Sequence, residues 1–151
     1  IELAAEDGLD VAIEVIPGVT AASAAAARLG APLMVDFAVV SLSDRLVSWE
    51  TIRARLEAAA AADFVVAIYN PRSRERVAQL DEAIAIFRRH RSATTPVGLA
   101  TAVGGDTEQI VVTDLGRVLE FDIGMQTIVM IGNRSSKLVG KWFITARGYR
   151  L

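Results

Sequence analysis

The stretch that decides the fold is Phe64-Val65-Val66-Ala67-Ile68-Tyr69-Asn70-Pro71-Arg72-Ser73. Its first five residues are apolar and mostly favour β structure, which predicts a buried central strand. The strand ends sharply at Pro71, because proline cannot donate to a strand ladder. An apolar stripe then predicts a helix that begins at a cap, Ser73, and runs to about His90. The stripe comprises Val77, Leu80, Ile84 and Phe87.

Strands and helices alternate in both directions from this stretch. Upstream, Gly8 ends a short helix, and Pro17-Gly18 and Gly30 separate the next elements. Downstream, strands follow one another around a glycine-rich turn. The fold class is therefore α/β, with a mixed sheet flanked by helices, parallel first and antiparallel later. The predicted strands are 11–15, 37–42, 64–68, 97–100, 109–112, 127–131 and a possible edge strand 142–145; the predicted helices are 1–7, 21–29, one capped by Ser48, and 73–90.

Bulk properties indicate a single globular domain. The 151 residues are 52% apolar and 23% charged, with a formal net charge of -2 and no cysteine. Scattered basic residues disfavour nucleic acid as the main partner, and the lack of cysteine excludes disulfides and thiolate sites. No apolar stretch approaches the roughly 20 residues of a membrane span, so we expect a soluble protein. The lack of cysteine fits a reducing compartment, and we expect the protein to be cytoplasmic. Because the chain starts at Ile1 within a helix-like run, we interpret residues 1–151 as one domain of a longer protein.

Small, hydroxylic or amide-bearing residues occur wherever a predicted strand ends. In open α/β sheets, ligands bind beyond the carboxyl ends of the strands, so we expect these exits to form one site. Their chemistry suits a neutral, hydrogen-bonding ligand such as an adenosine. The alternative is that their serines and threonines only cap helices and their glycines only form turns. The exits are residues 17–21, 41–44, 69–72, 102–106 and 132–135.

Other site chemistries lack their sequence signatures. Neither 104–106 nor 132–137 has the spacing of a phosphate-binding loop. The single histidine, His90, is expected to cap the end of its helix rather than act in catalysis. No metal-ligand spacing is visible, so no metal is expected, and no catalytic residue is assigned.

The motifs at the exits resemble the tetrapyrrole (corrin/porphyrin) methylase family. Val15-Ile16-Pro17-Gly18-Val19-Thr20-Ala21-Ala22 is similar to the motif that opens the second domain of that family. Segments 37–44, 67–73, 95–98 and 128–133 look like the branch that methylates precorrin-3B or cobalt-factor III at C17, and 145–149 is similar to its ending. The resemblance covers nearly all of the chain. It implies the second, C-terminal domain of a two-domain enzyme, without the N-terminal domain.

The resemblance implies an S-adenosyl-L-methionine-dependent methyltransferase that C-methylates a precorrin at C17, with ring contraction, in cobalamin biosynthesis. The protein would mainly position the reacting carbon and exclude water, because the cofactor supplies the reactive group. In the turn after Pro96 the family commonly has Asn, a small residue and Gly, where this chain has Ala102, Val103 and Gly104. The implied cofactor-binding residues are Thr20, Ala21, Tyr69, Asn70, Ala102, Val103, Gly104 and Thr127.

The substrate implied by the resemblance is a tetrapyrrole with many carboxylates, which arginine binds well through its planar fork. We hypothesise that Ser43, Arg45 and Arg72, each beside a strand exit, bind this substrate. The alternative is that both arginines are solvated surface residues, and Asp44 is expected to cap a turn. Expected partners are the N-terminal domain and a second copy in a homodimer. Two other functions stay open: another branch of the family, such as a uroporphyrinogen C-methyltransferase, or a non-catalytic binding or assembly module.

Overall fold

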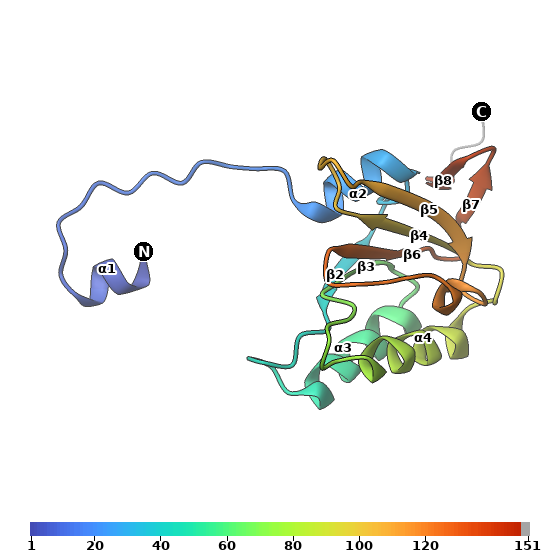
Figure 1. The fold of residues 1–151 in the computed structure, drawn as a ribbon, viewed down its shortest axis with the longest axis horizontal. Coiled ribbons are helices and arrows are strands. Elements are labelled where there is room, and N and C mark those ends of the chain that lie inside the picture. Colours follow the sequence, from blue (N-terminus) through green and yellow to red (C-terminus); the bar gives the residue numbers. More distant parts are fainter. Residues whose placement is uncertain (149–151) are drawn as a thin grey trace.

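The computed structural model describes residues 1–148, so Tyr149 of the predicted C-terminal motif lies outside the described residues. A central sheet has α2 on one face and α3 and α4 on the other, and an extended arm precedes α2 (Figure 1). The helices are α1 Glu2–Glu6, α2 Ala21–Leu29, α3 Trp49–Ala61, α4 Ala78–His90 and the 3-10 turn η1 Val118–Glu120. The strands are β1 Gly30–Ala31, β2 Phe37–Ser41, β3 Val65–Tyr69, β4 Pro96–Thr101, β5 Gln109–Asp114, β6 Thr127–Ile131, β7 Ser136–Val139 and β8 Trp142–Thr145.

The central sheet has the order β2-β3-β6-β4-β5. Strands β2 and β3 are parallel, whereas β6 is inserted antiparallel between β3 and β4, and β5 is antiparallel to β4. Strands β2, β3 and β4 therefore all run in one direction. This confirms the predicted mixed sheet, parallel in its early strands and antiparallel in its later ones.

Strand β3 is apolar throughout because helices cover both of its faces. Val66 and Ile68 point into the core formed with α3 and α4, while Val65 and Ala67 pack with α2. The same alternation holds in β6, where Val129 and Ile131 face α3 and α4, and Ile128 and Met130 face α2. The two-residue period of each central strand thus divides its side chains between two cores.

Helix α2 lies close to the sheet because its inward side chains are small. Ala22, Ala25 and Ala26 are buried on it. Opposite its last residue, Gly98 of β4 has no side chain, and a Cβ there would come within 2.5 Å of Leu29 Cδ1. The predicted cap Ser48 is present at α3, where its Oγ accepts from Thr51 N–H at 3.3 Å. Thr20 caps α2, since its Oγ1 accepts from Ser23 N–H at 3.2 Å.

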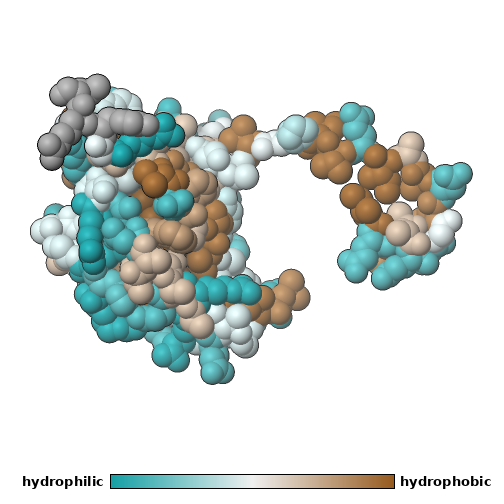
Figure 2. All heavy atoms as spheres, turned by 180° about the vertical axis from the view of Figure 1, so that it is seen from behind, coloured by the Kyte–Doolittle hydropathy of each residue, from teal (hydrophilic) through white to brown (hydrophobic). Residues whose placement is uncertain are grey.

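The predicted strand at 11–15 is wrong. The segment is extended and exposed, with no strand pairing, as part of the arm that precedes α2. Figure 2 shows this arm standing clear of the body, with many hydrophobic spheres along it. Alternation measures the capacity of a segment to form a strand, but a strand also needs a partner to satisfy its backbone groups.

Three further elements, α4, β7 and β8, differ from the predictions. Helix α4 begins at Ala78 instead of Ser73, because the Ser73 hydroxyl accepts from Arg76 N–H at 3.1 Å and closes a local turn instead. Strand β8 was expected at an edge, yet it lies between β1 and β7 in a small three-stranded sheet. Strand β7 was not predicted, since most of its side chains are exposed and carry no clear apolar pattern.

Candidate functional site

A pocket of about 410 Å³ lies at the edge of the central sheet where β3 and β4 end. Strand β6 runs the other way, so its first residues, rather than its last, reach the same edge. The N-terminal end of α2 forms another wall. The pocket is lined by Val19, Ala21, Ala24, Tyr69, Asn70, Ala100, Val103, Met125, Gln126 and Ile128.

The expectation that all five exits share one edge is wrong for residues 132–135. Because β6 is antiparallel, its exit lies at the opposite edge, where Asn133 Nδ2 donates to the Asp63 carbonyl just before β3 at 3.0 Å. Residues 17–21 do reach the pocket edge, although the described residues 1–16 form no strand. The exits of β2, β3 and β4 lie together as expected, because these strands run in one direction.

Four of the eight predicted cofactor residues line the pocket: Ala21, Tyr69, Asn70 and Val103. Thr20 caps α2 beside it, and Ala102 and Gly104 flank Val103 in the turn after β4. Thr127 is 1% exposed and bonds with its hydroxyl to the Thr101 hydroxyl at 2.8 Å. It lines an adjoining pocket of about 460 Å³ with Gly124, Met125 and Gln126.

Two lining residues, Tyr69 and Asn70, form hydrogen bonds with neighbouring elements. The Tyr69 hydroxyl accepts from Ala22 N–H at 2.7 Å and so satisfies a backbone donor of the first turn of α2. Asn70 has a φ of 50°, in the left-handed region that asparagine tolerates better than most residues. Its side-chain amide donates to Ser41 Oγ at 2.9 Å. The wall of the pocket is therefore tied both to α2 and to the exit of β2.

The lining of the pocket carries no ionisable group apart from the Tyr69 phenol. Its polar side chains belong to Tyr69, Asn70 and Gln126, and the others are aliphatic or thioether. Ala21 and Ala24 lie one helical turn apart and leave room beside α2. Such a lining suits a ligand that is held by packing, backbone groups and amides rather than by ion pairs.

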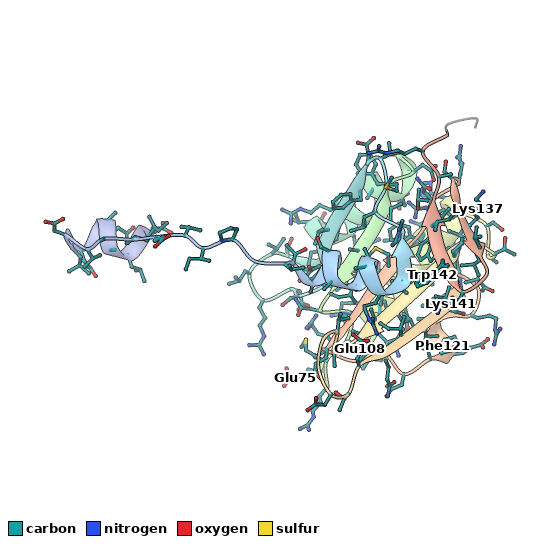
Figure 3. The ribbon with its side chains drawn as sticks, turned by 90° about the horizontal axis from the view of Figure 1, so that it is seen from above. Glu75, Glu108, Phe121, Lys137, Lys141 and Trp142 are labelled. Carbon is teal, nitrogen blue, oxygen red and sulfur yellow. The ribbon has the colours of Figure 1, made fainter. Side chains whose placement is uncertain are left out.

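The turn after β4 is held to α2 by Glu108. Its carboxylate accepts from Gly104 N–H at 2.9 Å and from Arg28 Nε at 2.8 Å. These bonds lower the pKa of Glu108, first through the Gly104 N–H and then through Arg28. Figure 3 shows Glu108 beside α2. The carboxylate thus fixes the position of Val103 relative to Ala21 and Ala24.

Ala102 has a φ of 49°, a conformation that costs an alanine roughly 1–2 kcal/mol. We expect Ala102→Gly to raise the free energy of unfolding by about 0.5–1 kcal/mol, because relief of this strain outweighs the added freedom of unfolded glycine. Urea denaturation measures the change. The matched control, Ala54→Gly on the exposed face of α3, should lower it by about 0.5–1 kcal/mol. Destabilisation at both positions would contradict the prediction.

Six of the lining residues are not among the predicted cofactor-binding residues, although one of them, Val19, lies within the predicted exit 17–21. Val19, Ala24 and Ala100 adjoin predicted residues, and helical spacing from Ala21 could have indicated Ala24. The others, Met125, Gln126 and Ile128, come from β6 and the loop before it. Nothing local in the sequence places them there, because their position depends on the insertion of β6 between β3 and β4.

None of the hypothesised substrate residues is part of the pocket lining. Ser43 donates its N–H to Ser41 Oγ at 3.1 Å, and Arg45 is exposed. Arg72 donates to Asp81 Oδ1 at 2.6 Å, and its Nε is buried without a hydrogen bond. Their roles in substrate binding stay predictions.

Asp44, expected to cap a turn, instead accepts from the Gln79 side-chain amide at 3.3 Å, and its carboxylate lies 3.8 Å from Arg76 Nε.

His90 of α4 contacts α3, on the sheet face opposite α2. Its Nε2 lies 2.5 Å from Glu57 Oε1, and Arg89 donates to the other carboxylate oxygen. These hydrogen bonds lower the pKa of Glu57. The contact gives His90 a structural role, although through a side chain of α3 rather than the helix-end carbonyls expected.

Two other kinds of site are absent from residues 1–148. No group of three or more His, Cys, Asp or Glu residues in this part of the chain is placed to hold a metal ion. No helix described there is long and apolar enough to cross a bilayer.

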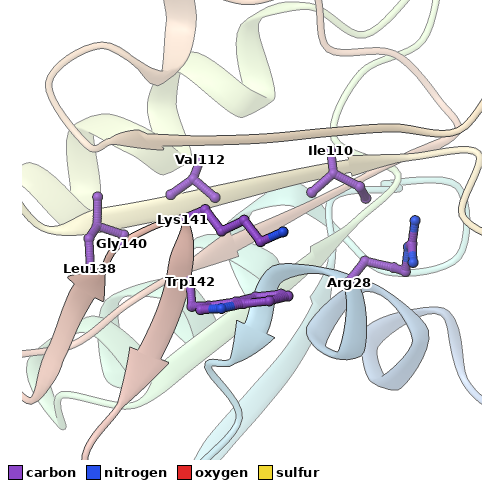
Figure 4. Close-up of a pocket in the computed structure, with 7 residues that line it drawn as sticks. All are labelled: Arg28, Ile110, Val112, Leu138, Gly140, Lys141 and Trp142. Atoms are coloured by element: carbon purple, nitrogen blue, oxygen red, sulfur yellow. The ribbon is translucent and has the colours of Figure 1, made fainter.

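A third hollow, of about 540 Å³, lies beside β5 and the β7–β8 hairpin. Figure 4 shows Trp142 on one side and Ile110 and Val112 on the other, with Arg28 at one end. The Lys141 ammonium lies 4.8 Å from the centre of the Trp142 ring, which is 45% exposed. None of the predicted site residues lies here.

The fold and the pocket define a class of protein: an α/β domain with a pocket of mostly small, uncharged side chains beyond the carboxyl ends of β3 and β4. Comparison with known proteins is more specific. The model of the family described as Tetrapyrrole (Corrin/Porphyrin) Methylases matches residues 1–119, and the chain belongs to this family.

Curated relatives share close to half of their aligned residues with this chain. A cobalt-factor III methyltransferase of Priestia megaterium is 49% identical over 140 residues, which are 93% of this chain and 26% of that protein. A probable cobalt-factor III C(17)-methyltransferase of Salmonella typhimurium is 43% identical over 151 residues, or 100% of this chain and 63% of that protein. The chain therefore spans less than two thirds of either relative.

Solved structures agree with the fold. The crystal structure of the methyltransferase CobJ matches with a TM-score of 0.87 and 36% identity, covering 95% of this chain and 60% of that chain. A uroporphyrin-III C-methyl transferase from Thermus thermophilus, complexed with S-adenyl homocysteine, matches with a TM-score of 0.56 and 20% identity, covering 82% and 51%. The second match shows likeness of fold alone.

Proposed function

We propose that this chain is the C-terminal domain of a cytoplasmic S-adenosyl-L-methionine-dependent methyltransferase that methylates a precorrin at C17, with ring contraction, in cobalamin biosynthesis. The observation that carries the proposal is the pocket lined by Ala21, Tyr69, Asn70 and Val103 at the shared edge of β3 and β4. Similarity to cobalt-factor III methyltransferases of two organisms supports the choice of branch.

The pocket fits an adenosyl group in its chemistry. Small side chains at Ala21 and Ala24 allow close approach to α2, and Asn70 and Gln126 supply amide groups for hydrogen bonds. When bound, the cofactor supplies the methyl group for transfer to a ring carbon. The chain's own residues hold the adenosyl group in place and keep water away from it. We assign Thr20, Ala102, Gly104 and Thr127 to the surroundings of the same site.

The proposal gives the substrate a place beside the cofactor. Ser43 and Arg45 follow the end of β2, and Arg72 follows the end of β3, two strands whose last residues, Ser41 and Tyr69, are paired. The two guanidinium groups would bind ring carboxylates, with Arg72 exchanging Asp81 for a substrate carboxylate.

The proposal also includes two protein partners, the N-terminal domain and a second copy of the enzyme. Several large apolar side chains are exposed on the domain, a feature typical of interaction surfaces. On the β7–β8 hairpin these are Leu138, Val139 and Trp142, and on β2 they are Phe37 and Val39.

The test is a calorimetric titration of S-adenosylhomocysteine into the full-length protein, with residues 1–151 titrated in parallel. We expect one site per full-length chain and binding at least about tenfold weaker to the isolated domain, because half of the cofactor cradle belongs to the other domain. Absence of binding to the full-length protein would contradict the proposal. It would favour a non-catalytic binding or assembly module instead.

A further inference from the structure

Arg76 lies in the loop between β3 and α4, and its side chain is 11% exposed. One terminal guanidinium nitrogen, Nη1, donates to the Leu42 carbonyl at 2.9 Å and to the Asn70 carbonyl at 3.3 Å. These carbonyls follow the last residues of β2 and β3, two neighbouring parallel strands. A single cation with little solvent exposure therefore bridges two strand exits.

The loop that carries Arg76 holds it in place. Arg76 N–H donates to Ser73 Oγ at 3.1 Å, and Ser73 N–H donates to the Arg76 carbonyl at 3.0 Å. On the outer side, the Asp44 carboxylate lies 3.8 Å from Arg76 Nε. The backbone bonds of Arg76 to Ser73 and the nearby Asp44 carboxylate thus hold the guanidinium in one orientation.

The same two exits are joined by a second set of bonds around Ser41. Its hydroxyl accepts from the Asn70 side-chain amide at 2.9 Å and from Ser43 N–H at 3.1 Å. Asn70 contributes both to this set and to the Arg76 bridge, and its left-handed φ of 50° is a conformation that surrounding contacts must maintain. Charged hydrogen bonds from a buried guanidinium are among the stronger contacts available for this purpose.

We propose that Arg76 is a positioning residue that sets the geometry of the cofactor wall at Tyr69 and Asn70 and links it to the β2 exit that carries Ser43. Arg76 itself does not line the pocket, so its effect on binding passes through the Asn70 and Leu42 carbonyls. This inference rests on the proposed function. It adds a residue that the sequence did not indicate and that the pocket lining does not reveal.

The experiment compares Arg76→Met and Arg76→Lys in the full-length protein. We expect Arg76→Met to weaken S-adenosylhomocysteine binding at least about tenfold in calorimetry. Arg76→Lys should restore part of the affinity, because an ammonium can still donate to one carbonyl. The control, Arg53→Met, removes an exposed arginine paired with Glu82 between α3 and α4 and should bind as the wild type does.

Hydrogen exchange separates positioning from general stability. In Arg76→Met, amides at 41–44 and 69–73 should exchange faster, while those of β4 and β6 keep their wild-type rates. Equally faster amide exchange in all strands of the sheet, or wild-type affinity in Arg76→Met, would contradict the role of Arg76. Neither result would contradict the proposed function. If the wild-type protein itself does not bind S-adenosylhomocysteine, the proposed function is wrong, and so is the proposed effect of Arg76 on cofactor binding.

Discussion

Ala21→Phe in the full-length protein is expected to abolish binding of S-adenosylhomocysteine. Ala21 lines the pocket at the first turn of α2, opposite Tyr69 and Asn70. A phenyl ring at this position would fill space that the adenosyl group needs. An overlap that costs more than about 3 kcal/mol weakens binding over 100-fold. Calorimetric titration measures the loss directly.

The matched control is Ala27→Phe, which places the same ring on the exposed side of α2. It should leave the dissociation constant within about twofold of the wild-type value, because surface substitutions away from a site have small effects. Equal affinity in Ala21→Phe and Ala27→Phe would show that the cofactor does not lie against α2.

The largest loss of stability is expected from Arg91→Met. Arg91 is 8% exposed, and its guanidinium donates to the carbonyls of Gly132, after β6, and Phe64, before β3. Burial lowers the pKa of Arg91 to about 10, so the group stays a cation at neutral pH. Loss of its donors leaves two buried carbonyls short of a partner, at about 1–3 kcal/mol each.

We therefore expect Arg91→Met to lower the free energy of unfolding by about 3 kcal/mol and Tm by about 6–12 °C. Thermal and urea unfolding measure these changes. Arg89→Met is the control, since the neighbouring guanidinium is 58% exposed and pairs with Glu57 at the surface. Its loss should cost no more than about 1 kcal/mol, and a similar loss in both variants would refute a special role for Arg91.

Local patterns were enough to predict the α/β fold and much of the site. The apolar run of β3 and its sharp end at Pro71 predicted a central strand, and β3 lies second in the sheet. Because β3 and β4 run in one direction, residues after each of them meet in one pocket. This is why Tyr69, Asn70 and Val103 could be grouped from the sequence before their positions were known.

The errors arise where long-range pairing decides the outcome. Residues 11–15 alternate as a strand does, yet they have no strand partner among the described residues. The direction of β6 depends on which strands accept it, so the sequence did not indicate that Gln126 reaches the pocket and that Asn133 lies at the opposite edge. Ser73 could cap either a helix or a local turn. In the structure its hydroxyl accepts from Arg76 N–H and closes a turn.

The antiparallel insertion of β6 has a consequence for biosynthesis of the protein. Synthesis proceeds from the N-terminus, so β2 with β3 and β4 with β5 leave the ribosome as two separate pairs. Their apolar inner edges stay unsatisfied until β6 emerges and joins them. Translation must therefore pass Ile131 before this sheet can close, and a nascent chain that ends at residue 119, where the family match stops, still lacks its central strand.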